Sequence, residues 1–146
     1  MDDRIEALLE EPYWVIDVLP ECVPADSGGQ FFDVEAWMLS GSRAVALRRR
    51  WLSLLMKINC YTDLRIRSGD SEADILNPSP DTMEGLVLAD RMHLCALLPA
   101  YDALITLTAG DLYMTLYNPP ESLLHLVRAL AASEGLFVWR PNNTLP

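Results

Sequence analysis

The clearest pattern of apolar and polar positions lies between residues 111 and 140. Residues 112–117 alternate apolar and half-polar side chains, which predicts a β-strand with two different faces. A helix is expected over 120–134, followed directly by a strand over 136–139. The expected helix signals are an Asn118 cap, Pro119 at the first position, a Glu121 capping box, the stripe Leu123, Val127 and Leu130, and a Gly135 stop. The crossover of this strand–helix–strand unit would be right-handed if its strands are parallel neighbours.

A β-hairpin is predicted just before this unit, from residues 102–108 and 111–117 around Ala109 and Gly110. A two-residue loop gives an apolar face with the pairs Leu107/Leu112, Ile105/Met114 and Ala103/Leu116. The other face would hold Thr106/Tyr113, Leu104/Thr115 and Asp102/Tyr117. Because Ala109 would then need a positive φ, a bulged turn that shifts the register by one residue is the alternative.

The first forty residues predict a helix over 2–10, a strand over 13–19, a loop over 20–29 and a helix over 31–39. Alternation places Tyr13, Val15, Asp17 and Leu19 on one face of the strand, and Trp14, Ile16 and Val18 on the other. Helical spacing aligns Phe31, Val34, Trp37 and Met38 along one side of the helix.

A long helix is predicted over 42–59, with a core stripe of Leu47, Trp51, Leu54 and Ile58. Its far side carries Val45, Leu52 and Met56, so either the 31–39 helix or another subunit must cover that flank. A strand over 62–67 and a polar loop over 68–78 follow. A further helix opens at Ser79 and extends as far as Leu98, although the pattern leaves open whether 90–98 is helix or strand.

These elements predict one α+β domain over residues 1–146. The expected architecture is a two-layer sandwich of about five mostly antiparallel strands, with helices 42–59 and 120–134 on one face. The closest simple arrangement is a ferredoxin-like core with extra helices.

Composition fits a globular domain, since 51% of the 146 residues are hydrophobic and 22% are charged. No apolar run approaches the roughly 20 residues that cross a bilayer, and the acidic N-terminus is unlike a signal peptide. The three cysteines are an odd number and lie far apart, which disfavours a disulfide framework. A cytoplasmic protein without membrane attachment is therefore expected.

The formal net charge of −10 is unevenly distributed. Residues 43–67 hold seven of the eleven basic residues and one acid, while the rest of the chain is strongly acidic. This acidic majority argues against nucleic-acid binding, which depends on neutralising phosphates. Within the basic segment Arg43, Arg50 and Lys57 recur every seven residues and form a basic ridge. The ridge could receive an acidic partner or a second copy of the chain, or could simply be solvated and paired with nearby acids.

The polar face of the hairpin is the first candidate site. Its members are Tyr113, Tyr117, Thr106, Thr115 and Asp102, called here the tyrosine face. Aromatic rings and hydroxyls on one surface can hold a ligand or a partner protein. The alternative is a solvent-exposed face without a binding role, because tyrosine and threonine are common strand residues.

Asp17 is the second candidate, because it lies within an otherwise apolar strand. Together with Asp102 it could form a carboxylate pair for acid–base chemistry or cation binding; alternatively it pairs with Arg65 or Arg67. Neither histidine lies in a catalytic or metal-binding spacing, and residues 70–81 only partly resemble a calcium loop. No catalytic residue, metal site or cofactor is predicted.

Two functional hypotheses follow. The first is a non-enzymatic, regulatory or immunity-type interaction domain that binds a protein partner or itself through the tyrosine face and the basic ridge. The second is a small-molecule or metal-dependent enzyme with its carboxylate site on the sheet face, at Asp17 and Asp102.

Overall fold

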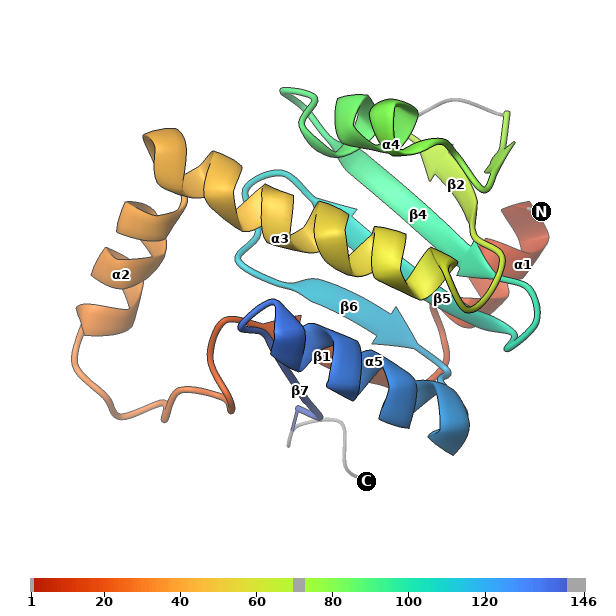
Figure 1. The fold of residues 1–146 in the computed structure, drawn as a ribbon. Helices are drawn as coiled ribbons and strands as arrows, with labels where there is room; N and C mark the ends of the chain where they lie inside the picture. Colours follow the sequence, from red (N-terminus) through yellow and green to blue (C-terminus); the bar gives the residue numbers. More distant parts are fainter. Residues whose placement is uncertain (1, 70–72, 142–146) are drawn as a thin grey trace.

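The computed structural model describes residues 2–69 and 73–141, which form one open antiparallel sheet flanked by helices (Figure 1). The seven strands lie in the order β3-β2-β4-β5-β6-β1-β7. They are β1 (Tyr13–Asp17), β2 (Arg65–Ser68), β3 (Ile75–Leu76), β4 (His93–Leu98), β5 (Ala103–Thr108), β6 (Met114–Tyr117) and β7 (Phe137–Trp139). The helices are α1 (Asp2–Leu8), α2 (Gln30–Met38), α3 (Gly41–Asn59), α4 (Pro80–Val87) and α5 (Glu121–Ser133). The α+β class is confirmed, but the five-stranded, ferredoxin-like arrangement is not.

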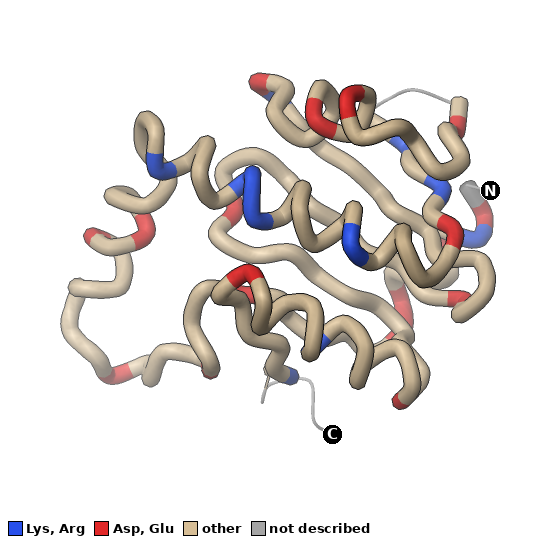
Figure 2. The backbone as a smooth tube through the Cα atoms, viewed as in Figure 1, with Lys and Arg blue, Asp and Glu red and all other residues tan. Residues whose placement is uncertain are grey.

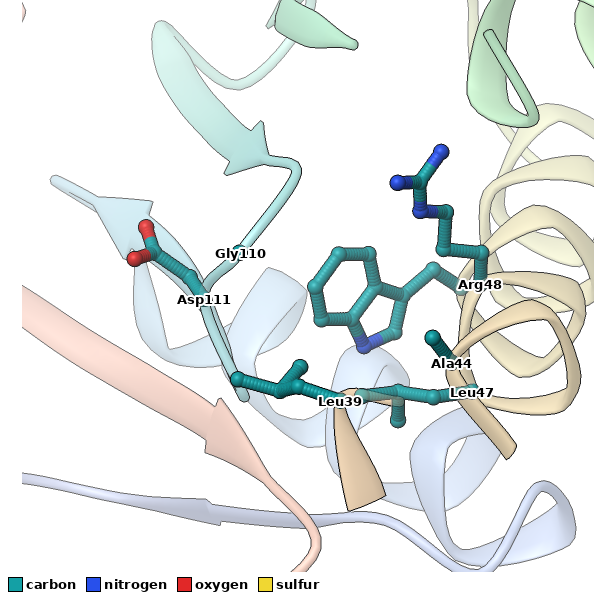
Figure 3. A pocket seen from close by; sticks show the side chains of 7 residues that line it. Leu39, Ala44, Leu47, Arg48, Gly110 and Asp111 are labelled. Carbon is teal, nitrogen blue, oxygen red and sulfur yellow. The ribbon is translucent and has the colours of Figure 1, made fainter. Parts of the chain in front are cut away.

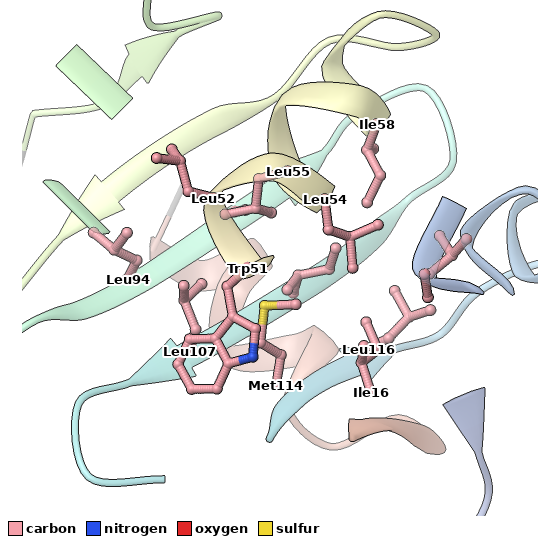
Figure 4. Packing of buried hydrophobic residues seen from close by; sticks show 14 of the residues in the cluster. Ile16, Trp51, Leu52, Leu54, Leu55, Ile58, Leu94, Leu107, Met114 and Leu116 are labelled. Carbon is pink, nitrogen blue, oxygen red and sulfur yellow. The ribbon is translucent and has the colours of Figure 1, made fainter. Parts of the chain in front are cut away.

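The main core lies between one face of the sheet and helices α3, α4 and α5 (Figures 1 and 4). Strand alternation supplies this face with Ile16, Ile105, Met114 and Leu116, all fully buried. A smaller cluster lies on the opposite face, where Ile5, Leu8, Leu97 and Leu104 pack α1 against β4 and β5. Helices therefore contact both faces, and α1 is an exception to the predicted one-sided arrangement. None of the helices described is long and apolar enough to cross a bilayer.

The second apolar flank of α3 is covered mainly by α4. Leu52 of α3 is buried in the same cluster as Met83 and Val87 of α4, and Met56 packs against that cluster. Val45, at the start of α3, remains exposed. Neither expected cover, the 31–39 helix or another subunit, is needed for Leu52, because a helix that follows later in the chain shields it.

The segment 79–98 contains a helix and a strand, which decides the alternative that the sequence left open over 90–98. Helix α4 begins after Ser79, whose side chain accepts a hydrogen bond from the Thr82 N–H, and it ends at Val87. Residues 93–98 instead form β4, a central strand between β2 and β5. Because both faces of this strand are covered, its sequence is a continuous apolar run without period-2 alternation, and helix and strand look alike in such a run.

The hairpin of β5 and β6 keeps its predicted faces but not its predicted register. The observed pairs are Leu104/Tyr117, Ile105/Leu116 and Thr106/Thr115, which is a shift of two residues from the expected pairing. The connection is wider than two residues, and the Asp111 N–H bonds to the Thr108 carbonyl across a turn with Gly110 at φ +97°. The positive φ thus falls on glycine rather than on Ala109, which removes the strain in the expected loop.

The strand–helix–strand unit is present, but β1 lies between its two strands. Both β6 and β7 pair with β1 in antiparallel fashion, so β6 and β7 are not neighbours and the handedness condition does not apply. Asn118 does not cap the helix: it has φ +58°, and its side chain donates to the Asp102 carbonyl. Helix α5 starts instead at Glu121, after Pro120.

Helix α2 extends away from the sheet as an arm (Figure 1). None of its residues is buried, and only Phe31 and Met38 pack against the main core. Val34 and Trp37, which the helical stripe placed beside them, are exposed. Trp37 stacks instead with the Arg43 guanidinium, 4.2 Å from the ring centroid.

Gly135 ends α5 at φ +71°, as predicted, and this conformation provides a test of the fold. Gly135→Ala is expected to lower the free energy of unfolding by about 1 kcal/mol, because a Cβ is strained at positive φ although there is space for it. The matched control is Gly85→Ala inside α4, which should raise it by roughly 0.5–1 kcal/mol. Urea unfolding measures both. Equal effects of the two substitutions would contradict this helix end.

Candidate functional site

A groove of about 830 Å³ lies on the sheet face opposite α3 and α5. Its floor is formed by alternate residues of the last three strands of the sheet, β6, β1 and β7. These floor residues are Tyr113, Thr115, Tyr117, Tyr13, Val15, Asp17 and Trp139. They face outward because the intervening residues, such as Ile16 and Met114, are in the main core.

The pairing of β1 with both neighbours fixes the positions of these side chains. Tyr13 lies beside Tyr117, with ring centroids 5.7 Å apart. Val15 pairs with Thr115 on one side and with Trp139 on the other. Three strands thus present a rigid, mostly aromatic surface, with a carboxylate at the end where β1 stops.

The segment after β1 forms the wall of the groove. It is lined by Leu19, by the loop residues from Glu21 to Gly28 except Asp26, and by Phe31 and Phe32 in the first turn of α2. Phe31 is half-buried, whereas Phe32 is exposed, and their rings meet edge to face. An open groove therefore runs between the sheet and the base of the α2 arm.

Asp17 is the most buried polar residue in the groove, with 7% of its surface exposed. Its Oδ1 accepts a hydrogen bond of 2.7 Å from the Val18 backbone N–H. Burial raises the pKa of Asp17 above its ordinary value, and the charge of Glu35 adds to the rise, while the N–H groups of Val18, Leu19 and the Trp139 indole oppose it. The Trp139 Nε1 is itself buried and makes no hydrogen bond of ordinary geometry.

The charged residues of the groove are all acidic. Asp17 and Glu21 line it, and no Lys, Arg or His does so in the part of the chain that the structure describes. Figure 2 shows further acidic positions along the loop and the α2 arm, while basic residues gather along α3 on the other side of the sheet. Burial, followed by the charge of Asp111, also raises the pKa of Tyr113. The groove is thus apolar, aromatic and negatively charged.

The structure brings together part of the predicted tyrosine face. Tyr113, Tyr117 and Thr115 line the groove, together with Asp17. Thr106 lies on the next strand, β5, opposite Thr115. Burial raises the pKa of Tyr117, and a hydrogen bond between Tyr117 and the Thr106 side chain partly offsets this rise. Asp102 lies outside the groove, in the turn before β5.

The proposed carboxylate pair of Asp17 and Asp102 is not formed. Leu104, Tyr117 and Tyr13 lie side by side in the sheet, and Asp102 comes two residues before Leu104, near the start of β1. There Asp102 forms an ion pair with Arg4 of α1. Asp17 lies at the opposite end of β1, and the four residue steps from Tyr13 to Asp17 alone span about 13 Å. The two carboxylates are therefore too far apart to share a proton or a cation. Nor does Asp17 pair with Arg65 or Arg67, because their strand, β2, is separated from β1 by three strands in the sheet.

The basic ridge makes contacts within the chain. Arg43 donates to the Trp37 carbonyl at the end of α2, and Lys57 pairs with Glu134 at 2.5 Å, where α5 ends. The charge of Arg50 also acts on Glu134: burial raises the pKa of this carboxyl, but its bonds to Lys57 and Ser53 and these charges lower it overall. The ridge thus holds α2 and α5 against α3, and its binding of a separate partner stays a prediction.

A second cavity, of about 40 Å³, lies between α3 and the turn at Gly110 (Figure 3). Asp111 at its rim points away from the cavity, and Arg48 donates a hydrogen bond to the Ala89 carbonyl. Its volume suits a small number of water molecules rather than a substrate. Among residues 2–69 and 73–141, no three His, Cys, Asp or Glu side chains gather in a way that could hold a metal ion. The segment 70–81, which only partly resembles a calcium loop, lies partly outside the described residues.

Part of the groove was not expected from the sequence. Trp139 and the loop wall were not among the predicted site residues. Tyr13, Val15 and Asp17 were placed on one face of their strand, but the strands that pair with it were not predicted. Comparison of the chain with protein-family models, curated proteins and solved structures finds no match. The function is therefore inferred from the chemistry of the groove itself.

Proposed function

We propose that this protein is a non-enzymatic binding domain that captures an apolar, basic segment of a partner protein in the groove. The observation that carries this proposal is Asp17, a buried carboxylate in an aromatic groove that no basic side chain lines among the residues described. A buried carboxylate without a cation is unfavourable for the protein alone. A basic partner would supply the missing charge.

The size of the groove supports a peptide segment as its occupant. About 830 Å³ is near the upper end of the range of ligand pockets, and the groove is partly open to solvent. Tyrosine and tryptophan provide large contact areas with little loss of side-chain entropy, which is why they dominate protein interfaces. Because the floor is a sheet, the rings are already in place before binding.

The overall charge supports a basic partner rather than a second copy of the chain. At a net charge of −10, this protein attracts basic partners over long distances and repels its own copies. The basic residues that could offset this repulsion are engaged internally, since Arg43, Arg49 and Lys57 contact groups of the same chain.

A random-peptide library displayed on phage tests the proposal. The immobilised wild-type protein should enrich peptides that combine Lys or Arg with apolar residues and should deplete Asp and Glu. Tyr113→Ala, which removes a groove ring that is 41% exposed, should reduce binding of the enriched peptides about tenfold or more. Tyr61→Ala is the matched control, because Tyr61 is 66% exposed and does not line the groove.

The variants separate groove binding from general adhesion. Enriched peptides that bind Tyr113→Ala and Tyr61→Ala equally well would place the binding surface elsewhere. Enrichment without any bias toward basic residues would contradict the role of the acidic groove. Tyr117 is unsuited to this test, because it packs against the α1 cluster and its loss would also lower stability.

A further inference from the structure

The Asp17 end of the groove has the features of a receptor for one particular side chain. We propose that it binds the ammonium group of a lysine from the partner segment, and that it prefers lysine to arginine. This inference rests on the proposed function and specifies which residue type anchors the partner. It follows from the burial of Asp17, the bond it already makes and the rings around it.

The access to Asp17 is limited. Only 7% of its surface is exposed, which favours a slender group over a broad one. A lysine side chain is an unbranched chain of methylene groups that ends in a compact ammonium, whereas arginine ends in a broad planar fork. The methylene groups would lie along apolar floor residues such as Val15 and Leu19.

The hydrogen bonding of Asp17 also favours an ammonium. Arginine binds carboxylates best through two parallel bonds, one to each oxygen. Here Oδ1 already accepts the Val18 N–H at 2.7 Å, and the Leu19 N–H and the Trp139 indole also act on the carboxylate, so the paired approach of a guanidinium is hindered. An ammonium needs only one bond to the carboxylate and can approach it as a point charge.

The surrounding rings complete the receptor. Trp139 pairs with Val15, two residues from Asp17 along β1 and on the same face, and Tyr113 is close enough for the Asp17 charge to act on its hydroxyl. Aromatic faces near an ammonium add an attractive interaction beyond that with the carboxylate. The second acid of the groove, Glu21, lies on the loop wall and is exposed, so it should contribute less.

Small probes that copy the two side chains test the preference by NMR titration of the full chain. The probes are n-butylammonium for lysine, n-propylguanidinium for arginine and 1-pentanol for chain length without charge. The readout is the indole N–H resonance of Trp139, with those of Trp37 and Trp51 as internal controls because neither lines the groove. Butylammonium should bind at least about tenfold more tightly than 1-pentanol, as expected for a charge-assisted hydrogen bond, and more tightly than propylguanidinium, whose planar fork fits the site less well.

Two variants locate the binding. Asp17→Asn should reduce butylammonium affinity about tenfold or more, while Glu10→Gln, at an exposed acid that does not line the groove, should leave it unchanged. If Asp17→Asn disturbs the fold, Thr115→Lys is the second variant. Its side chain starts diagonally across from Asp17 and would compete with butylammonium from within the groove.

The outcomes separate this inference from the proposed function. Tighter binding of propylguanidinium would overturn the lysine preference and leave capture of a basic segment intact. Equal binding of 1-pentanol, or full affinity in Asp17→Asn, would show that Asp17 does not select the ligand, whatever the peptide library enriches. A library without basic peptides would contradict the proposed function even if butylammonium binds.

Discussion

Asp17→Asn is expected to make the protein more stable at neutral pH while removing its affinity for cations. The substitution keeps the shape of the side chain and an oxygen that can accept the Val18 N–H, but it removes a charge that burial disfavours. The melting temperature should rise by a few degrees, which is the shift that about 1 kcal/mol causes in a domain of this size. A gain in stability with a loss of binding is typical of residues kept for function.

The pH dependence of this gain has a defined sign. Because the pKa of Asp17 is raised in the folded protein, the unfolded chain loses its proton first as pH rises past 3.8, and the wild type loses stability from there until the folded carboxyl also ionises. The stability difference between Asp17→Asn and wild type should therefore be small near pH 3.5 and largest at pH 7. Thermal melts of both proteins at the two pH values measure it. Glu35, the nearby acid that adds to the rise, is unchanged in both.

A wild type more stable than Asp17→Asn at pH 7 would mean that a cation inside the protein already compensates the carboxylate. That result would remove the main support for an external basic partner. Glu21→Gln serves as the control, because an exposed acid on the loop wall should change the melting temperature little.

Trp51→Ala is expected to have the largest effect on stability, lowering the free energy of unfolding by about 3–5 kcal/mol. Trp51 is 1% exposed and extends from α3 toward Leu107 and Met114 of the sheet (Figure 4). Its removal would leave a cavity at the contact between the two layers. Trp51→Phe should cost much less, because phenylalanine fills most of the space and eliminates a buried indole N–H that has no hydrogen-bond partner.

Trp37→Ala is the matched control for this experiment. Trp37 is 59% exposed on the α2 arm and stacks only with Arg43, so its loss should cost less than about 1 kcal/mol. Urea unfolding followed by circular dichroism gives the midpoint and slope for each variant. Similar costs at the two positions would contradict the placement of α3 as the helix that covers the centre of the sheet.

The faces of individual elements could be predicted from the sequence with good accuracy. Leu112, Met114 and Leu116 are buried while Tyr113 is exposed, because successive side chains of a strand point to opposite faces, which places apolar and polar residues on different sides. The stripe of α3 is likewise buried at Leu47 and Trp51, since the period of a helix is equally local. These patterns depend only on neighbouring residues.

Errors arose where the outcome depended on distant parts of the chain. Residues 93–98 form a strand because β2 and β5 pair with its two edges, and nothing within those six residues indicates this pairing. Asn118 binds the Asp102 carbonyl rather than the start of α5, because the fold brings that turn beside it. The residues that contact the basic ridge could not be predicted either, because Glu134 is far from Lys57 in sequence.

By itself, the sequence determined the α+β class, the two-sided character of β1 and β6 and the acidic nature of the protein. Only the tertiary structure decided that β1 lies between β6 and β7, which unites two separate polar faces and Trp139 into one groove. The physical reason is that side-chain periodicity is set by local backbone geometry, whereas strand order is set by which apolar faces pack together. A binding site built from neighbouring strands therefore exists only once the sheet has formed.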